Sequence, residues 1–366
     1  MISFVIAAYN EEKNIVRCIE PILKTGEKFE VVIVDDGSKD RTLEIAKKIS
    51  QEDPRVKVVH QENSGVSVAR NTGLEQVTGS WVAFADADDI ICSSYLSAFS
   101  SYIETEKYDI LQALQYKNNP YPEDDEFYEF PAQYLQLVAL NRQHYINSND
   151  SKFAGILESV HGAVSKLFSV SFLKRNNLCF KEGMGLGEDL LFYIEALERT
   201  EKVVCINKNI YRITENMNSS TRRFNKKMID YTYIFNQAIY DFYEKNSKGE
   251  EFYADMCAQI LVHVEVGITQ TILKSKKWPE WREIDSYYSR IFDDERIYKA
   301  IRCTCIKMRP PIIKAKQRIL WIPIWLLANK KPQLYLFFRF LERKYIQHKI
   351  ESQQEALIYE NKKIGH

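Results

Sequence analysis

Apolar and polar positions alternate in blocks over residues 1–90. Four runs of mainly apolar and β-branched residues predict strands, and the first two are continuous enough for strands buried on both faces. These runs are 2–10, 29–38, 56–62 and 80–89. Segments with apolar residues at helical spacing separate them, at 11–26, 41–52 and 67–77. Strands that alternate with helices in this way predict an α/β fold, a mainly parallel sheet sandwiched by helices.

The polar residues of this region gather where the predicted strands end. They are Tyr9, Asn10 and Glu11, then Asp35 and Asp36, and finally the FADADD segment at 84–89. Ligands of open parallel sheets bind at the carboxyl ends of the strands. We therefore expect these three groups to form one site.

The pattern changes after residue 107. The acidic, aromatic and Pro-containing stretch 118–133 is expected to form a loop or lid rather than core. A helix from about Asp189 and a strand over 203–213 follow, and the pattern is then helical to the end. We predict two domains, 1–221 and 222–366, with the boundary near Thr221.

Charge is distributed unevenly along the chain. The 50 Lys and Arg residues balance 50 Asp and Glu residues, so the whole molecule has no general attraction for nucleic acid. Residues 299–350, however, hold thirteen basic residues and one acid, interleaved with Trp, Phe, Tyr and Leu. This composition favours helices lying on an anionic membrane surface. The alternative is a helical subdomain that packs on the catalytic domain or on another subunit.

Cysteine spacing, the first residues of the chain and the length of the apolar runs indicate the cellular compartment. The seven cysteines are scattered without a C-x-x-C pair, which favours reduced, cytosolic thiols. The start lacks the basic region of a signal peptide, and no apolar run reaches the roughly 20 residues that span a bilayer. We expect a cytoplasmic protein, peripheral on the inner face of the plasma membrane.

Asp86, Asp88 and Asp89 place three carboxylates within four positions at the end of an apolar strand. Hard oxygen ligands suit Mg²⁺ or Mn²⁺, which proteins hold with one or two carboxylates plus substrate phosphates. Zn²⁺ is not expected, because the segment 84–89 contains no His or Cys. The alternative, a helix cap before residue 93, explains one of the three acids.

Two further segments carry chemistry only in combination. VDDGSKDRT places Asp36 at a strand end, where it can accept hydrogen bonds from a nucleobase or ribose. NSGVSVARNTG places Gly65 before a helix and supplies Arg70 as a permanent cation for a diphosphate or base carbonyl. Each alone is explained as well by a turn or a solvated helix face. No G-x-G-x-x-G follows the first strand, and no P-loop motif occurs.

The order AAYNEE, VDDGSKDRT, NSGVSVARNTG, FADADD and GEDLLF resembles the family 2 inverting glycosyltransferases of bacterial polysaccharide biosynthesis. The resemblance covers about residues 2–221 and implies the GT-A fold. It also implies a divalent metal, Mn²⁺ or Mg²⁺, and a nucleotide-diphosphate sugar, UDP-linked, as donor. A hexose or aminohexose would pass to a hydroxyl of a glycan or lipid-linked acceptor, in a product such as capsule or cell-wall polymer.

The resemblance implies a role for each motif residue. The nucleotide would be bound by Ala8, Tyr9, Glu11, Asp36, Gly65, Arg70 and Asp86. The metal would be bound by Asp86 and Asp88. The general base would be Asp189, beside Glu188, and the acceptor or phosphate would be contacted by His161, Lys166 and Arg212. Thr214 departs from the pattern, because many relatives carry there a His that completes the metal site.

An inverting transfer needs such a base, because a carboxylate must deprotonate the acceptor hydroxyl opposite the departing diphosphate. Glu188 and Asp189 are otherwise explained as acids that complement a helix dipole. Two other functions remain open. A nucleotidyltransferase would need a Gly-rich basic loop after the first strand, where this chain is acidic. A nucleotide-sugar-binding protein without turnover would not need Asp189. The pattern does not distinguish a monomer from a homo-oligomer.

Overall fold

The computed structural model describes residues 1–25, 28–105, 107–124, 126–148, 153–214, 225–273, 282, 286, 288–289, 292–307, 325–331, 333–336 and 339. The chain divides into two units, Met1–Met256 and Cys257–His366. The predicted boundary near Thr221 falls outside the described residues and stays a prediction.

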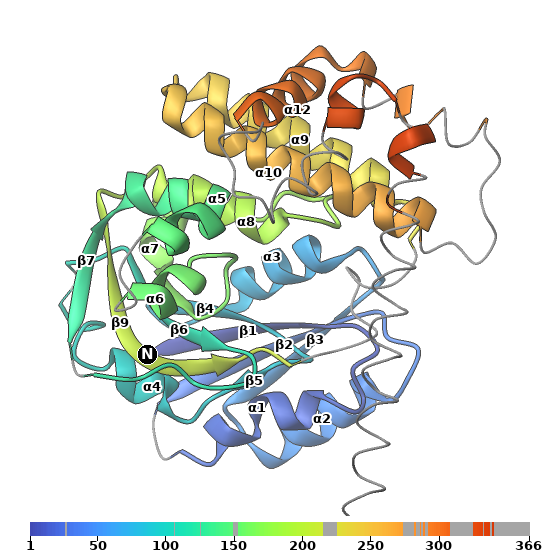
Figure 1. Cartoon of the computed structure of the whole chain (residues 1–366). Helices are drawn as coiled ribbons and strands as arrows, with labels where there is room; N and C mark the ends of the chain where they lie inside the picture. Colours follow the sequence, from blue (N-terminus) through green and yellow to red (C-terminus); the bar gives the residue numbers. More distant parts are fainter. Residues whose placement is uncertain are drawn as a thin grey trace, which may run out of the picture. The chain divides into compact units, whose positions relative to one another are not determined.

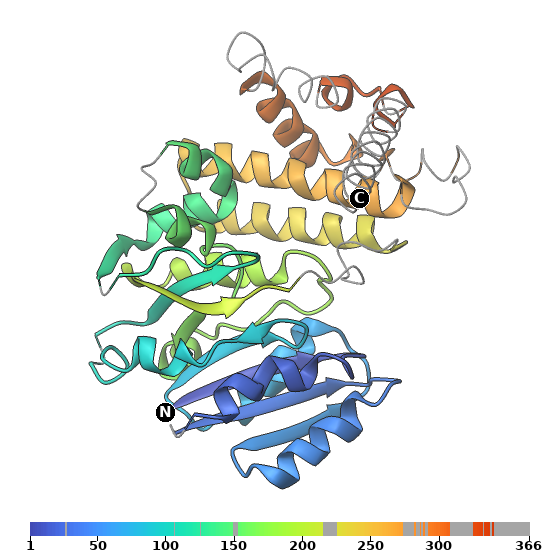
Figure 2. The same ribbon diagram turned by 60° about the horizontal axis from the view of Figure 1, so that its bottom comes forward.

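The predicted alternation of strands and helices over the first ninety residues is confirmed. The strands are β1 (Ile2–Ala8), β2 (Phe29–Asp36), β3 (Val56–Gln61) and β4 (Trp81–Asp86). The helices between them are α1 (Ile15–Leu23), α2 (Thr42–Glu52) and α3 (Val66–Gln76). The four strands are parallel in the order β3-β2-β1-β4, and they form the blue-to-cyan half of the sheet (Figures 1 and 2).

The second half of the sheet is mixed. Its strands are β5 (Ile90–Ile91), β6 (Ile110–Tyr116), β7 (Phe127–Pro131), β8 (Lys166–Ser169) and β9 (Lys202–Arg212). The order continues from β4 through β8, β6 and β9 to β5, and β7 also pairs with β9. Strand β8 is antiparallel to both β4 and β6, whereas β6 and β9 are parallel.

The prediction of a loop or lid over 118–133 is wrong in part. Strand β7 lies within this stretch and pairs antiparallel with β9. Its residues are alternately exposed and half-buried, so the strand adds little to the core. The acidic residues before the strand gave the stretch the composition of a loop. The partner strand β9 lies some seventy residues further along the chain, so no local signal indicated the pairing.

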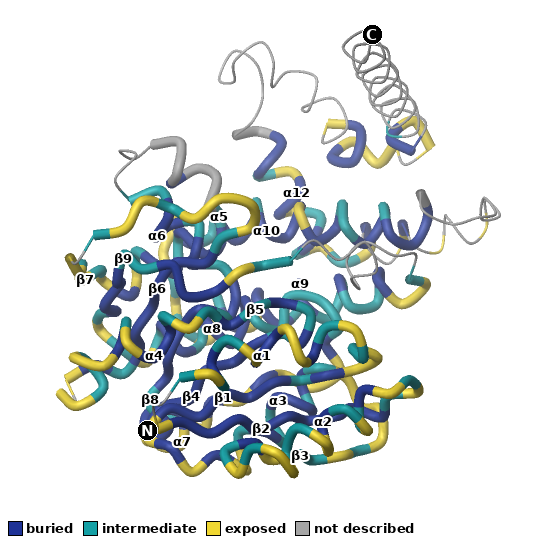
Figure 3. Tube along the Cα trace, turned by 90° about the horizontal axis from the view of Figure 1, so that it is seen from below, coloured by how far each residue is buried: buried dark blue, intermediate teal, exposed yellow. Residues whose placement is uncertain are grey.

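Helices cover both faces of the sheet. Below it in Figure 1 lie α1, α2 and α4 (Ser94–Phe99), and above it lie α3 and α8 (Glu188–Leu197). Strands β1, β2 and β4 are almost wholly buried between these layers, as their continuous apolar runs predict (Figure 3). On the α8 side, Phe84 of β4 packs edge-on against Phe180 and Phe192, which stack on each other with centroids 4.2 Å apart.

The remaining helices of the first unit surround the second half of the sheet or follow it. They are α5 (Ala132–Ser148), α6 (Ala154–Glu158), α7 (Val170–Arg175) and α9 (Met228–Lys245). Helix α10 (Glu250–Ile268) passes into a π-helical turn (Thr269–Leu273), and α12 (Glu295–Lys307) belongs to the second unit. The predicted helical character after residue 222 is confirmed where the chain is described.

The cysteines and the helices bear on the predicted compartment. All seven cysteines are free thiols. Within the described residues, no helix combines the length and apolar character needed to cross a membrane. The basic stretch 299–350 lies mostly outside the described residues, so its membrane role stays a prediction.

Candidate active site

The carboxyl ends of β1, β2 and β4 lie at one edge of the sheet. Ala7 of β1 is in register with Asp86 of β4, and Ala8 with Asp35 of β2. The parallel register therefore brings together the polar segments that follow these strands, as the sequence predicts. This edge is where open α/β sheets bind their ligands.

Arg70 of α3 links this edge to the start of α8. Its side chain is 4% exposed, and it donates from Nη2 to Asp86 Oδ1 at 2.7 Å and from Nη1 to Glu188 Oε1 at 3.0 Å. The guanidinium also lies over the Phe180 ring, 5.1 Å from the centroid. A buried guanidinium is tolerated only when it is paired, so these two carboxylates are required where they are.

Glu188 and Asp189 open helix α8. Burial raises the pKa of Glu188 to about 7; the neighbouring charge of Asp189 adds to this rise and Arg70 opposes it. Asp189 Oδ1 accepts the Leu190 N–H at 2.8 Å, while Oδ2 faces Gly162, where an added Cβ would lie 2.6 Å away. The Asp189 carboxylate is therefore held by backbone on two sides, in a position to accept a proton.

The loop Asp86–Asp89 is tied to the end of β9. The Asp86 N–H donates to the Tyr211 hydroxyl oxygen at 2.9 Å, and the Thr214 N–H donates to Asp89 Oδ1 at 2.7 Å. The Thr214 hydroxyl donates to the Asp88 carbonyl. Burial, together with the charges of Asp86 and Asp88, raises the pKa of Asp89 to about 7. Asp89 thus holds the loop, a role distinct from those proposed for the other two acids.

Asp86 and Asp88 are the residues that could hold a metal. The Asp86 side chain is 41% exposed although one oxygen meets Arg70. Among the described residues, no group of three or more His, Cys, Asp and Glu side chains forms a metal site. Two carboxylates completed by phosphate oxygens and water are an ordinary set for Mg²⁺ or Mn²⁺. Asp86 keeps an exposed side chain beside Asp88 in the sequence, so the residues fit such an ion.

Asp36 organises the loop before α3. Its Oδ1 accepts from Gln61 Nε2 at 2.8 Å and from the Ser64 N–H at 2.9 Å, and its Oδ2 accepts from the Gly65 N–H at 2.9 Å. Gly65 has a φ of +92°, and nothing lies within 4 Å of an added Cβ. The glycine is therefore required by its backbone conformation, and its face is open to a ligand. A nucleotide contact for Asp36 stays a proposal.

Residues after β1 line the same edge. Ala8 is buried, while the Tyr9 ring is 45% exposed and offers a surface on which a planar base can pack. Glu11 Oε2 accepts from Asn14 Nδ2 at 2.6 Å. Burial raises the pKa of Glu11, and the Asp88 charge adds to the rise, which places Glu11 beside the acidic loop.

The three residues expected on the acceptor or phosphate side differ in how far they are buried. Arg212 is exposed at the end of β9, in register with Ile90. His161 is partly exposed and precedes Gly162, which contacts Asp189. Lys166 is completely buried, and its Nζ donates to the backbone carbonyls of Ser159 and Val164. We therefore do not propose that it contacts a ligand.

Two site residues escaped the sequence analysis. Arg17 of α1 donates to the Asp88 carbonyl at 2.9 Å and to Asn14 Oδ1 at 3.0 Å, which places a cation beside the acidic loop. Gly162 lies so close to Asp189 that an added Cβ would be 2.6 Å from its Oδ2. A glycine next to His161 was the only local signal, because both contacts depend on how loops pack.

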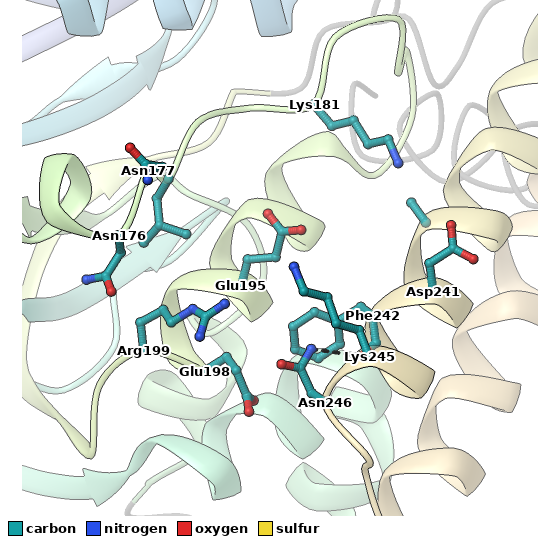
Figure 4. Close-up of a pocket in the computed structure, with 12 residues that line it drawn as sticks. Asn176, Asn177, Lys181, Glu195, Glu198, Arg199, Asp241, Phe242, Lys245 and Asn246 are labelled. Atoms are coloured by element: carbon teal, nitrogen blue, oxygen red, sulfur yellow. Dashed lines mark hydrogen bonds between the residues drawn. The ribbon is translucent and has the colours of Figure 1, made fainter.

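A cavity of about 300 Å³ lies at the far end of α8, away from Asp189 (Figure 4). Its lining includes Lys181, Glu195, Arg199 and Lys245, and none of the predicted site residues. Burial raises the pKa of Glu195, whereas the charges of these three cations lower it. The cavity thus combines opposing charges, which select neither an anion nor a cation.

Solved structures define the class of this fold. The S. aureus TarS fragment 1-349, crystallised with UDP-GlcNAc, superposes with a TM-score of 0.64 at 21% identity, covering 95% of this chain and 92% of that one. Its complex with UDP matches with a TM-score of 0.60. With its mainly parallel sheet and acids at the strand ends, the chain has the GT-A glycosyltransferase fold.

Sequence relatives give the family. Residues 3–164 match Glycosyl transferase family 2. Glycosyltransferase GlyG of Streptococcus pneumoniae is 30% identical over 58% of this chain and 69% of its own length. The uncharacterized glycosyltransferase EpsJ of Bacillus subtilis is 30% identical over 60% of this chain and 63% of its own, less than two thirds. The succinoglycan biosynthesis protein ExoO of Rhizobium meliloti is 31% identical over 54% of this chain and 55% of its own length. The chain belongs to glycosyl transferase family 2, and by class it is a glycosyltransferase.

Proposed function

We propose that the protein is an inverting glycosyltransferase that moves a hexose or aminohexose from a UDP-sugar to a hydroxyl of a glycan or lipid-linked acceptor. The observation that carries the proposal is the bridge made by Arg70. It places the strand-end acid Asp86 beside Glu188, and hence beside Asp189. A donor held at the strand ends would then lie next to a carboxylate that can accept a proton.

In this proposal Asp189 takes the proton of the acceptor hydroxyl as that oxygen attacks the anomeric carbon. The bond from this carbon to the diphosphate breaks, and the diphosphate leaves on the opposite face. Glu188 shares Arg70 with Asp86, and burial raises the pKa of Glu188 to about 7. Tyr9, Asp36, Gly65 and Arg70 would form the nucleotide side.

Asp86 and Asp88 would hold a divalent ion, Mn²⁺ or Mg²⁺, which supplies positive charge to the leaving diphosphate when bound. Without a third protein ligand at Thr214, the remaining ligands would be phosphate and water. The TarS complexes with UDP and UDP-GlcNAc support a uridine donor. His161 and Arg212 would stand on the acceptor or phosphate side.

Calorimetric titration with UDP, with and without Mn²⁺, tests the donor side of this proposal. Wild-type protein should bind UDP more tightly with the metal, and Asp88→Ala should abolish the metal effect. Asp53→Ala is the matched control, because Asp53 precedes β3 at the opposite edge of the sheet. Absence of UDP binding under any metal would exclude a uridine donor.

We further propose that residues 299–350 hold the enzyme on an anionic membrane surface, on the cytoplasmic side, where lipid-linked acceptors are found. The support is their thirteen basic residues against one acid. Replacing Lys314, Lys316, Lys330 and Lys331 by Gln should abolish sedimentation with phosphatidylglycerol vesicles, whereas Lys47→Gln with Lys48→Gln on exposed α2 should not. Unchanged sedimentation of the fourfold variant would exclude the anchor and favour an oligomer contact.

A further inference from the structure

Lys166 is a buried lysine, and removing its amine from water destabilises the folded state. The side chain is completely buried at the start of β8, and burial lowers its pKa to about 7. No ion pair joins it to a carboxylate among the described residues. Its Nζ instead donates to the carbonyl oxygens of Ser159 at 2.8 Å and Val164 at 3.2 Å. Burying an amine in this way lowers the stability of the fold, so an apolar residue of the same size would give a more stable core.

The two carbonyls belong to the loop 159–165, and Lys166 joins its beginning to its end. The loop contains two residues with positive φ, Gly162 at +80° and Ser165 at +58°. Ser165 is a buried residue that is not glycine, so its conformation has to be maintained by the surrounding contacts. The two hydrogen bonds from the Lys166 amine are among the contacts that maintain this loop conformation.

Strand β6 anchors both ends of this loop. The Gln115 N–H donates to Ser159 Oγ at 2.8 Å, and the Ala113 N–H donates to the Ser165 carbonyl at 3.0 Å. The Lys166 amine adds a bond inside the loop, past Gly162, at the Val164 carbonyl.

The middle of the loop lies against the Asp189 carboxylate. The Gly162 backbone lies so close to Asp189 Oδ2 that an added Cβ would be 2.6 Å from it. Lys166 also reaches the helix that carries Asp189, because its Nζ lies over the Tyr193 ring, 4.5 Å from the centroid. Tyr193 stands four residues after Asp189 and hence on the same face of α8. One amine thus contacts both elements that confine the carboxylate.

We propose that Lys166 is a positioning residue, which fastens the loop 159–165 against α8 so that the Gly162 backbone fixes the carboxylate of Asp189. The inference rests on the proposed function, since it takes Asp189 as the base. A purely structural lysine would affect stability alone. A positioning lysine changes kcat while the nucleotide site, on the far side of Arg70, keeps its affinity.

Lys166→Met tests this inference, since Met has similar length and flexibility but no donor. Lys174→Met on exposed α7 is the control. Three quantities are measured: the rate of UDP release from the UDP-sugar that binds best, the Kd for UDP, and amide hydrogen exchange of residues 159–165. We expect kcat to fall by about 10- to 100-fold, UDP affinity to stay within about twofold, and exchange of the loop to accelerate.

Hydrogen exchange does not depend on activity, so it separates this inference from the proposed function. Unchanged exchange of residues 159–165 in folded Lys166→Met would overturn the inference even if Asp189 is the base. A parallel loss of kcat and UDP affinity would overturn it too. If Lys166→Met does not fold, Gly162→Ala decides, because its Cβ would displace the Asp189 carboxylate directly. A loss in kcat alone supports the inference, and unchanged kcat contradicts it.

Discussion

Arg70 determines the charge balance of the site at the scale of single residues. It is paired with two acids of different environment, Asp86 at 41% exposed and Glu188 at 12%. Even with this cation at 3.0 Å, burial keeps the pKa of Glu188 at about 7. Protonation near neutral pH is therefore expected on Glu188.

This raised pKa predicts how stability depends on pH. The folded protein keeps a proton on Glu188 up to about pH 7, while the unfolded chain loses it near pH 4.5. The native state binds more protons across this window, so the free energy of unfolding falls as pH rises from about 4.5 to 7, by up to about 3 kcal/mol. Asp89, whose pKa is also about 7, adds a slope of the same sign.

Glu188→Gln should reduce this slope, and the slope from Asp89 should remain. Urea unfolding at several pH values between 5 and 7.5 measures the effect. Glu75→Gln, on an exposed part of α3, should leave the slope as in wild type. An equally steep slope in Glu188→Gln would show that the pKa of Glu188 is not raised by the fold.

At the scale of elements, the position of Arg70 depends on how closely α3 packs on the sheet. Gly73, one turn after Arg70, faces β1, and an added Cβ would lie 2.3 Å from Val5 Cγ1. The helix can approach the strand only because this residue has no side chain. Its buried neighbours in α3 include Ser67 and Ala69, which are small as well.

Gly73→Ala should therefore destabilise the protein by about 1–3 kcal/mol through overpacking, despite the better helix propensity of Ala. It should also weaken UDP binding, because α3 must shift and carry Arg70 with it. Glu75→Ala on the same helix is the control for propensity alone. Thermal unfolding and UDP titration give both readouts, and a Gly73→Ala protein as stable as wild type would contradict the close packing.

The elements also show what sequence patterns can predict. Strands β1, β2 and β4 were predictable because burial on both faces leaves a continuous apolar run. Their parallel register then places Asp86, Asp35 and Asp36 at the same edge of the sheet, on either side of β1. Strand β7 was missed because it is an exposed edge strand that depends on distant β9. The contacts of Arg17 with Asp88 and of Gly162 with Asp189 were missed because loop packing leaves no periodic signal.

At the scale of the whole molecule, family membership and the proposed mechanism rest on different parts of the chain. The family match covers residues 3–164 and ends before Glu188 and Asp189. The residues proposed for the nucleotide side lie within the matched range, whereas the proposed base lies outside it and rests on the bridge through Arg70 and the proximity of Gly162. The base is accordingly the central claim.

The most direct test of this claim is Asp189→Asn, with UDP affinity and turnover measured on the same preparation. Asn preserves the size and the acceptor oxygen for the Leu190 N–H, but it cannot take a proton. We predict a UDP Kd within about twofold of wild type and a fall in the rate of sugar transfer of about 10²- to 10⁴-fold. Asp53→Asn, at the opposite edge of the sheet, should leave both values unchanged. Transfer at the wild-type rate by Asp189→Asn would contradict the assignment of the base, whatever the UDP affinity.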